Sequence, residues 1–408
     1  MLNKTNKYDK MIFLLIAVLC FGNIGGSLQI SRLLAVVLSP ILLSRMKYCT
    51  YSRELSVVYI CFLFYCVLSM LWTPDTTEGL KDFIYFIVHG LLFFEILVFS
   101  KFAKKPLESL SWGWTISVLL CSIVALWEIN TGNHLSIAKD QSSMHNFGAG
   151  NIIEANAASV TFFNYNSCVT FLCFSLPWII YRAFTPSSGV LGKLISIVTL
   201  LIGCFVIINN ASRGGLITMV LMIAAVAFKS FGKVKVVLGI VILVILTIYL
   251  LINFGSEFTA LIIARTANGG LLDGSSRTEV WGDALAVFFN SFGFGVGVGG
   301  MQAALTEYRP NGLPITHNMF LEVLVQYGLV FFCAFVYFLY RAFLRSFRNR
   351  NTFHGFIALV ALLVMPVYGI IDSGYLLSAH LYGLLGTIYV FSYYERIKYS
   401  GKVLRSTT

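Results

Sequence analysis

Three arginines and one histidine are the residues of this 408-residue chain whose types and positions could do chemistry together. They are Arg213, Arg265, Arg277 and His317, which all lie beside or between long apolar blocks. The planar guanidinium group of arginine binds phosphate oxygens in a bidentate manner, and imidazole takes up a proton near neutral pH. If the fold gathers these side chains, they predict a site for an anionic, phosphate-bearing substrate with a general base beside it.

Each of these residues also has an ordinary structural interpretation. External arginines often pair with acids, and the same part of the chain offers Asp273, Glu279, Asp283 and Glu307. His317 could simply cap the helix that follows it. Taken one at a time, a structural ion pair explains each arginine equally well, whereas several cations on one face of the protein favour a binding site.

The composition shows where such a site would lie. The chain is 58% hydrophobic and only 12% charged, about half the charge of an average soluble domain. Its apolar residues form blocks of about 20, which is the length that crosses a bilayer as a helix. The sequence therefore predicts an all-α polytopic membrane protein in which residues 1–408 form a single integral membrane domain.

Hydropathy predicts about twelve membrane-spanning helices. We place them at 11–29, 30–46, 56–72, 82–100, 109–127, 160–181, 190–208, 213–229, 234–253, 318–340, 355–372 and 376–394. The first two are interrupted by Gly25, Gly26 and Arg32.

The lysines and arginines concentrate in alternate connections between these spans. Only seven of the 29 fall in the other set of connections. They are Arg32, Lys81, Lys139, Arg213, Arg265, Arg277 and Arg309. By the positive-inside rule the rich connections and both termini are cytoplasmic, so these seven face outward. The net charge of +11 then reflects topology and anionic lipid rather than nucleic acid.

Two of the outward connections are long. The first covers 128–159 and contains His134 and His145, which have no acid or cysteine at metal-ligand spacing and resemble plain surface histidines. The second covers 253–317, between the ninth and tenth expected spans. Apolar periodicity after a capping-box pattern predicts an amphipathic helix over 277–290, and a second helix is expected near 299–307.

The second loop contains the glycine stretch Ser291–Met301, SFGFGVGVGGM, with the spacing Gly-x-Gly-x-x-Gly of a dinucleotide-binding fingerprint. That fingerprint requires a strand before it and a helix after it. Here the stretch follows an expected helix, and it lies outside the membrane. We therefore exclude nucleotide binding and expect the glycines to let the backbone approach another segment closely.

Five short motifs resemble those of the bacterial O-antigen ligase and surface-polysaccharide polymerase family. In order they are Leu71–Asp75 (LWTPD), Phe162–Asn166 (FFNYN), Ser212–Gly215 (SRGG), Arg277 and Trp281 followed by Gly293–Gly297 (GFGVG), and His317-Asn318 with Leu321 and Gly328. In the second motif Tyr165 stands where the family usually has proline. The resemblance covers roughly residues 70–345 and rests on the order and common outward placement of the motifs.

The resemblance implies a multi-pass glycosyltransferase of the GT-C type in the bacterial cytoplasmic (inner) membrane, acting at its outer face without a metal or cofactor. The donor would be an undecaprenyl-diphosphate-linked oligosaccharide, and the acceptor a lipid-linked repeat unit or lipid A–core. Arg213, Arg265 and Arg277 would bind the diphosphate, and His317 would orient or deprotonate the acceptor hydroxyl. A flippase and a chain-length regulator would be protein partners.

The resemblance leaves polymerase and ligase open, and we favour the polymerase because diverse polymerases of capsule and O-unit polysaccharides share these loose motifs. Two other classes compete. A transporter or flippase of lipid-linked sugars would need charges through the bundle and repeated halves, whereas one strong acid, Glu95, lies within a span. A non-catalytic scaffold would not need a long external loop with helices of its own.

Overall fold

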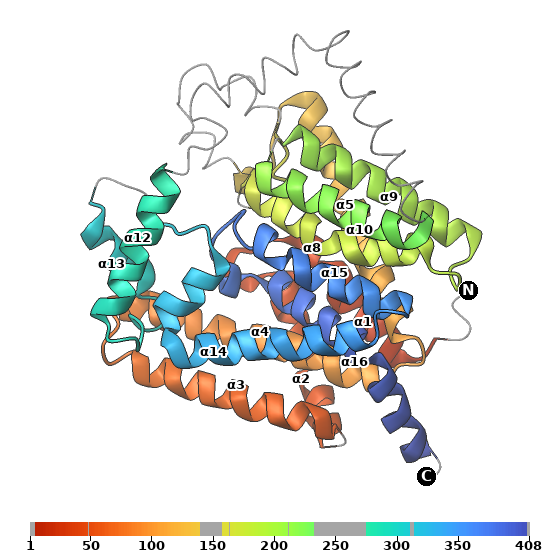
Figure 1. Cartoon of the computed structure of the whole chain (residues 1–408), viewed down its shortest axis with the longest axis horizontal. Coiled ribbons are helices and arrows are strands. Elements are labelled where there is room, and N and C mark those ends of the chain that lie inside the picture. The colour runs from red at the N-terminus through yellow and green to blue at the C-terminus, as the bar shows by residue number, and fades with distance from the viewer. Residues whose placement is uncertain are drawn as a thin grey trace.

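The computed structural model describes residues 5–47, 49–138, 157–162, 164–210, 212–231, 275–310 and 314–405. Within these ranges every regular element is a helix (Figure 1). The α-helices are α1 Lys7–Ala17, α2 Ile30–Met46, α3 Thr50–Ser69, α4 Thr76–Phe102, α5 Pro106–Thr131, α8 Tyr165–Phe184, α9 Val190–Asn209, α10 Arg213–Phe231, α12 Ser275–Asn290, α13 Met301–Tyr308, α14 Met319–Arg348, α15 Phe353–Tyr368 and α16 Ala379–Arg405. Short 3₁₀ turns cover Val18–Phe21, Gly26–Leu28, Ser136–Ala138 and Tyr375–Leu377.

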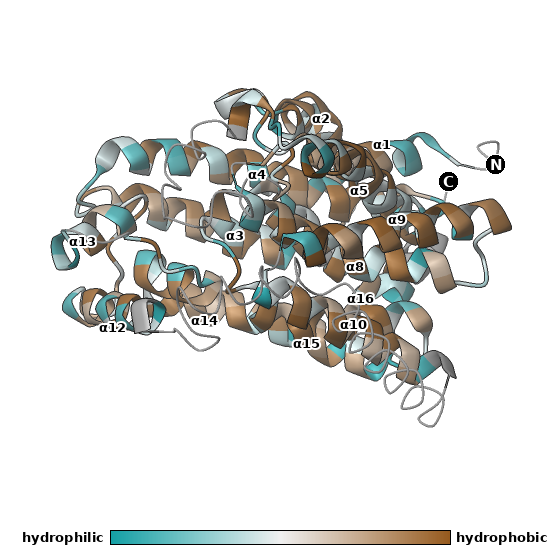
Figure 2. Ribbon diagram, turned by 90° about the horizontal axis from the view of Figure 1, so that it is seen from above, coloured by the Kyte–Doolittle hydropathy of each residue, from teal (hydrophilic) through white to brown (hydrophobic). Residues whose placement is uncertain are grey.

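Five of the described helices are long and apolar enough to cross a membrane: α4, α5, α8, α9 and α14. In Figure 2 their ribbons are coloured mainly as hydrophobic, whereas α12 and α13 carry many hydrophilic residues. This confirms that the described part of the chain is all-helical and has the character of a membrane protein. The total of about twelve spans stays a prediction, and the ninth expected span, 234–253, lies outside the described residues.

The first expected span, 11–29, is wrong in its C-terminal half. Helix α1 ends at Ala17, and the 3₁₀ turn after it ends at Phe21. The next residue, Gly22, has a φ of 45°, in the left-handed region that a continuing helix does not use. A side chain at Gly22 would also meet the carbonyl oxygen of Thr161 at 2.7 Å. The chain turns here because another segment occupies the space.

Polar contacts hold α1 against the connection between α4 and α5. The carboxylate of Asp9 accepts hydrogen bonds from the backbone N–H groups of Lys104 and Lys105, at 3.1 and 2.7 Å. Helices α12 and α13 lie on the left in Figure 1. Lys105 and Arg182, from two connections expected on the cytoplasmic side, both lie near Glu108, at 3.0 and 3.9 Å. Five of the seven expected outward cations lie in the described residues, and the side of the membrane that they face stays a prediction.

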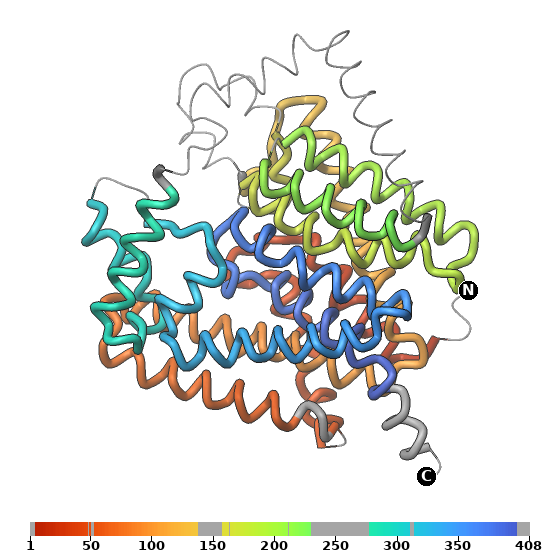
Figure 3. The backbone as a smooth tube through the Cα atoms, viewed as in Figure 1, coloured from red at the N-terminus to blue at the C-terminus, as the bar shows by residue number. Residues whose placement is uncertain are grey.

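The glycine stretch packs against a break in α14. Gly328 has non-helical angles, φ 75° and ψ −180°, and interrupts the helix. Figure 3 traces the backbone of the whole bundle as a tube. The carbonyl groups of Val325 and Gln326 instead accept hydrogen bonds from the backbone of Val296 and Gly297, at 2.9 and 3.1 Å. A Cβ on Gly295 would lie 2.5 Å from the nitrogen of Gly328. The glycines therefore serve close backbone packing, as the sequence predicts.

The same stretch is held from its other side by the C-terminal end of α3. The indole of Trp72 donates to the carbonyl of Gly295 at 3.0 Å, and the Thr73 hydroxyl donates to that of Val298 at 2.8 Å. These bonds connect the Leu71–Asp75 motif to the glycine motif, which lie more than 200 residues apart in the sequence. The two motifs are therefore one structural unit that fixes α12 and α13 on the end of the bundle.

Candidate functional site

Helix α12 carries Arg277 in its first turn, so the amphipathic helix predicted over 277–290 is confirmed as Ser275–Asn290. Arg277 is partly exposed, and its Nη1 donates to the carbonyl oxygen of Ile370 at 3.0 Å. One turn further on, the indole of Trp281 donates to the carbonyl of Thr316 at 2.8 Å. Residues four apart share a helix face. Trp281 thus holds the segment before His317 against the face that presents Arg277.

His317 lies directly before α14, where Asn318 caps the helix by accepting from the backbone N–H of Phe320 at 3.0 Å. The predicted helix start is confirmed, and Asn318 rather than His317 supplies the cap. His317 has a φ of 46°, a left-handed conformation that costs energy for a residue other than glycine. Its Nδ1 is buried and has no hydrogen-bond partner among the described residues. The imidazole therefore retains a polar atom that no described neighbour uses.

Arg213 is the first residue of α10 and is exposed. The adjacent Gly214 faces the loop after α15, because a Cβ there would lie 2.8 Å from Cγ1 of Ile371. The charge of Arg213 acts on Arg277: burial lowers the pKa of Arg277, and the neighbouring Arg213 lowers it further. Because Arg277 binds Ile370 and Gly214 packs against Ile371, the two arginines lie beside the same loop.

The positive charge also reaches His317. Burial lowers the pKa of His317 to about 4, the charge of Arg277 contributes in the same direction, and a hydrogen bond with the backbone of Asp372 opposes it. The imidazole is thus neutral near pH 7 and able to accept a proton. The structure brings together Arg213, Arg277 and His317, which the sequence placed on one face of the protein.

The loop between α15 and α16 holds this cluster, and sequence reasoning missed it. Ile370 binds Arg277, Ile371 faces Gly214, and Asp372 lies beside His317. The expected span 355–372 included Ile370, Ile371 and Asp372, but α15 ends at Tyr368, so these residues lie in a loop. The dipeptide Ser373-Gly374 directly after Asp372 is the turn signal that could have marked the loop.

Asp372 is only 8% exposed and is hydrogen-bonded to the start of α8. Burial raises the pKa of Asp372, and hydrogen bonds with the side chains of Ser167 and Asn164 lower it. Asn164 is also the N-cap of α8, accepting from the backbone N–H of Ser167 at 2.8 Å. The Phe162–Asn166 motif therefore reaches the cluster through Asn164.

A buried carboxylate on α14 holds the loop between α15 and α16 in place. The oxygens of Glu322 accept hydrogen bonds from the backbone N–H groups of Gly374 and Tyr375, at 2.9 and 3.1 Å. The Tyr375 hydroxyl in turn accepts from the backbone N–H of Asp372 at 2.9 Å. These bonds make the loop a preorganised frame rather than a free connection.

The other external arginines have different surroundings. Arg309 forms ion pairs with Asp283 at 3.1 Å and with Glu279 at 3.3 Å, which is the structural alternative that the sequence left open. Glu279, the acid nearest to Arg277 in the sequence, is therefore paired with Arg309. No carboxylate of the described residues lies within 4.0 Å of Arg277. Arg265 lies outside the described residues.

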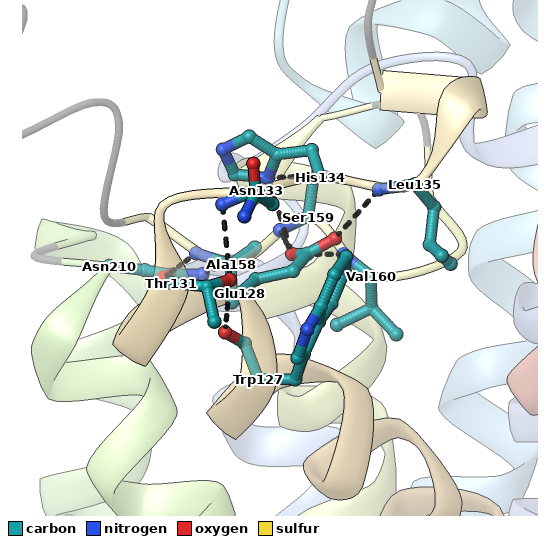
Figure 4. A network of polar contacts seen from close by, with 10 residues as sticks. All are labelled: Trp127, Glu128, Thr131, Asn133, His134, Leu135, Ala158, Ser159, Val160 and Asn210. Atoms are coloured by element: carbon teal, nitrogen blue, oxygen red, sulfur yellow. Dashed lines mark hydrogen bonds and ion pairs between the residues drawn. The ribbon is translucent and has the colours of Figure 1, made fainter.

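A second buried acid holds the segment that leads into α8 (Figure 4). Glu128, in the last turn of α5, is 0% exposed and accepts from the backbone N–H groups of Ser159 and Val160 at 2.7 and 2.9 Å. Asn210 binds both backbone groups of Ala158 at 2.8 Å. Because Asn210 precedes Arg213 and this segment precedes Asn164, the bonds set the positions of both site elements.

His134, interpreted from sequence as a plain surface residue, contributes to this network. Its Nδ1 lies 3.5 Å from a carboxylate oxygen of Glu128, and its side chain is 18% exposed. The expected external loop 128–159 also begins later than predicted, since α5 continues to Thr131 and ends at Gly132, which has a φ of 67°. An acid at a membrane boundary requires a partner, and this signal could have identified Glu128.

The fold and the cluster together define a class: an all-helical protein with helices suited to crossing a membrane and a cationic site at one end of the bundle. Comparison with known proteins gives a more specific result. Residues 198–336 match the family model described as O-antigen ligase. This stretch contains Arg213, Arg265, Arg277 and His317.

The chain is also 23% identical over 314 residues to the "Teichuronic acid biosynthesis protein TuaE" of Bacillus subtilis (strain 168). The match covers 72% of this chain and 62% of the relative. The two comparisons support an O-antigen ligase/polymerase-like family for this chain, in agreement with the resemblance read from its motifs.

Proposed function

We propose that the protein transfers an oligosaccharide from an undecaprenyl-diphosphate-linked donor at the outer face of the bacterial cytoplasmic membrane. The product is a longer surface polysaccharide of the O-antigen, capsule or exopolysaccharide kind. The observation that carries the proposal is that Arg277, His317 and the start of α10 with Arg213 all meet the loop that follows α15.

The charges suit the donor. A diphosphate brings negative charge to a place where Arg213 and Arg277 repel each other, so its binding relieves that repulsion. Breaking the bond between the sugar and the diphosphate adds further negative charge to the leaving group. Preorganised guanidinium groups stabilise such developing charge because they need no reorganisation as the bond breaks.

His317 supplies the proton acceptor. Its neutral imidazole takes the proton of the acceptor hydroxyl as the hydroxyl oxygen bonds to the anomeric carbon of the donor sugar. The bond from that carbon to the diphosphate oxygen breaks in the same step, and undecaprenyl diphosphate leaves with the electron pair. The proton then passes from His317 to solvent or to the leaving group. No metal takes part in this scheme.

Polymerisation of repeat units is favoured over ligation to lipid A–core, because the similar Bacillus protein is named for the biosynthesis of teichuronic acid and not for a lipid A–core. The ligase reaction uses the same site and differs only in the acceptor. A flippase of lipid-linked oligosaccharides is the third candidate. The feature that favours a flippase is Glu95, which is buried without a hydrogen-bond partner among the described residues.

The test compares the glycan ladders of cells in which the gene has been deleted and replaced by a variant. Arg277→Gln removes the charge and is expected to lower transfer by about 10²–10³-fold. Arg309→Gln is the matched control, because that arginine already binds Asp283 and Glu279 and should keep the normal ladder. Single repeat units on the acceptor indicate lost polymerisation, and long chains left on undecaprenyl diphosphate indicate lost ligation. A normal ladder with Arg277→Gln refutes the proposal.

A further inference from the structure

A groove of about 410 Å³ runs between α2 and α4, away from the cationic cluster. Its walls are apolar, with Leu33 and Ile84 about half exposed, whereas Arg32 and Lys81 line it nearer the starts of the two helices. The start of α2 meets the loop between α15 and α16, because Arg32 binds the carbonyl of Leu377. From Thr77 to Val88 the groove follows α4 for roughly 16 Å at 1.5 Å per residue. A polar outer end above an apolar channel is the shape of a lipid with an anionic headgroup.

The charge of Arg32 is the second observation. Its side chain is buried, at 6% exposure, and no carboxylate of the described residues lies within 4.0 Å. Its guanidinium donates to Nε2 of His89 at 3.1 Å and to the carbonyl groups of Ser27 and Leu377, both at 3.3 Å. These bonds use three of its five N–H groups. A buried charge with only neutral partners favours a bound anion.

The rim of the groove offers further groups for a phosphate. Arg32 lies over the ring of Tyr85, 3.6 Å from its centroid, and the Tyr85 hydroxyl lies 2.9 Å from that of Ser27. Lys81 is paired with Glu78 at 2.9 Å, with both side chains about half exposed. Such a surface pair contributes at most about 1 kcal/mol, so Lys81 can turn to a phosphate.

The groove is connected to the candidate site through one loop. Leu377, which binds Arg32, is seven residues after Ile370, which binds Arg277. Seven residues reach at most about 24 Å, a distance that a short oligosaccharide can bridge. A lipid phosphate at Arg32 could therefore present its sugar end to His317, whereas a structural lipid would need no such link.

We propose that this groove binds a second lipid-linked saccharide, the acceptor, with its diphosphate at Arg32 and Lys81 and its prenyl chain along Leu33 and Ile84. The assignment rests on the proposed function, since a polymerase joins two lipid-linked molecules. Bulk anionic phospholipid is the competing occupant, because its phosphate would bind the same side chains, Arg32 and Lys81.

The test measures binding of radiolabelled undecaprenyl diphosphate to the full chain in phosphatidylcholine nanodiscs. The wild type should bind two molecules per chain. Ile84→Trp fills the groove without changing charge and should leave one, and Lys81→Gln should weaken the second site about tenfold. Controls are Leu201→Trp, an exposed apolar position on α9, and Lys105→Gln, whose pairing with Glu108 at 3.0 Å matches that of Lys81.

The double variant Arg213→Ala/Arg277→Gln should lose the first molecule and keep the second. Two molecules bound to Ile84→Trp, or one bound to the wild type, overturns the groove assignment. Displacement of the second molecule by phosphatidylglycerol in the disc assigns the groove to bulk lipid and overturns it as well. The proposed function fails on a different readout, namely normal transfer by Arg277→Gln.

Discussion

At the scale of single residues, the environment of His317 determines how the transfer should depend on pH. The free enzyme holds this imidazole neutral because burial and the charge of Arg277 lower the pKa to about 4. The strained backbone at His317, with its φ of 46°, indicates that the surroundings impose its position. A base prepared in this way needs no deprotonation before the substrate arrives.

The expected result is a kcat/KM that holds as pH falls below 6.5 and declines with a midpoint near pH 4. The sign follows from the lowered pKa, since protonation disables the base only below that value. The profile of kcat/KM reports the free enzyme and can be measured with a purified lipid-linked donor. His317→Gln should remove this decline together with most of the activity. A midpoint near 6.5 would contradict the assigned environment.

At the scale of elements, the glycine stretch and the break in α14 act as one joint. Gly295 requires its φ of 85° and also has no room for a Cβ beside Gly328. Gly26 also has a positive φ, 57°, but nothing lies within 4 Å of a Cβ there. Comparing substitutions at Gly26 and Gly295 therefore distinguishes the energetic cost of a left-handed backbone conformation from the cost of steric crowding.

Gly26→Ala should lower stability by about 1 kcal/mol, the cost of the left-handed conformation alone. Gly295→Ala should lower it by about 3–5 kcal/mol, since overpacking adds to that cost. The loss of folded protein on heating in detergent measures both. Equal effects of the two substitutions would show that crowding at Gly328 is unimportant.

The segment held by Glu128 is a second element whose role is to position others. Glu128→Gln removes the negative charge that accepts from the backbone N–H groups of Ser159 and Val160, and puts an amide N–H₂ group in place of one of its two acceptor oxygens. We expect a loss of about 1.5–3 kcal/mol, typical of a hydrogen bond to a charged group, together with a higher KM for the donor. Asn130→Ala, on the same helix but exposed, should change neither. An unchanged KM would limit Glu128 to stability.

At the scale of the whole molecule, the distribution of lysine and arginine along the chain predicts the topology. Gln302 on α13 should face outward, and Asn351, between α14 and α15, should face the cytoplasm. In a cysteine-free background, Gln302→Cys should react with an impermeant maleimide in intact cells. Asn351→Cys should react only after permeabilisation. The reverse pattern would place the candidate site in the cytoplasm and reject the proposed reaction.

The sequence by itself determined the helical class, the helix start at Asn318 and the amphipathic α12. These features depend on local composition, periodicity and capping, which neighbouring residues encode. The close-packing role of the glycines was also predictable, because no strand precedes them.

The tertiary structure decided which cations are available to a substrate. Arg309 and Arg277 are both external arginines in sequence, yet the fold pairs Arg309 with Asp283 and leads Arg277 to a backbone carbonyl. It also brought Asp372 to His317 and separated Arg32 from any described carboxylate. These contacts join segments 26 to 345 residues apart. They follow from how whole helices pack, which no local pattern specifies.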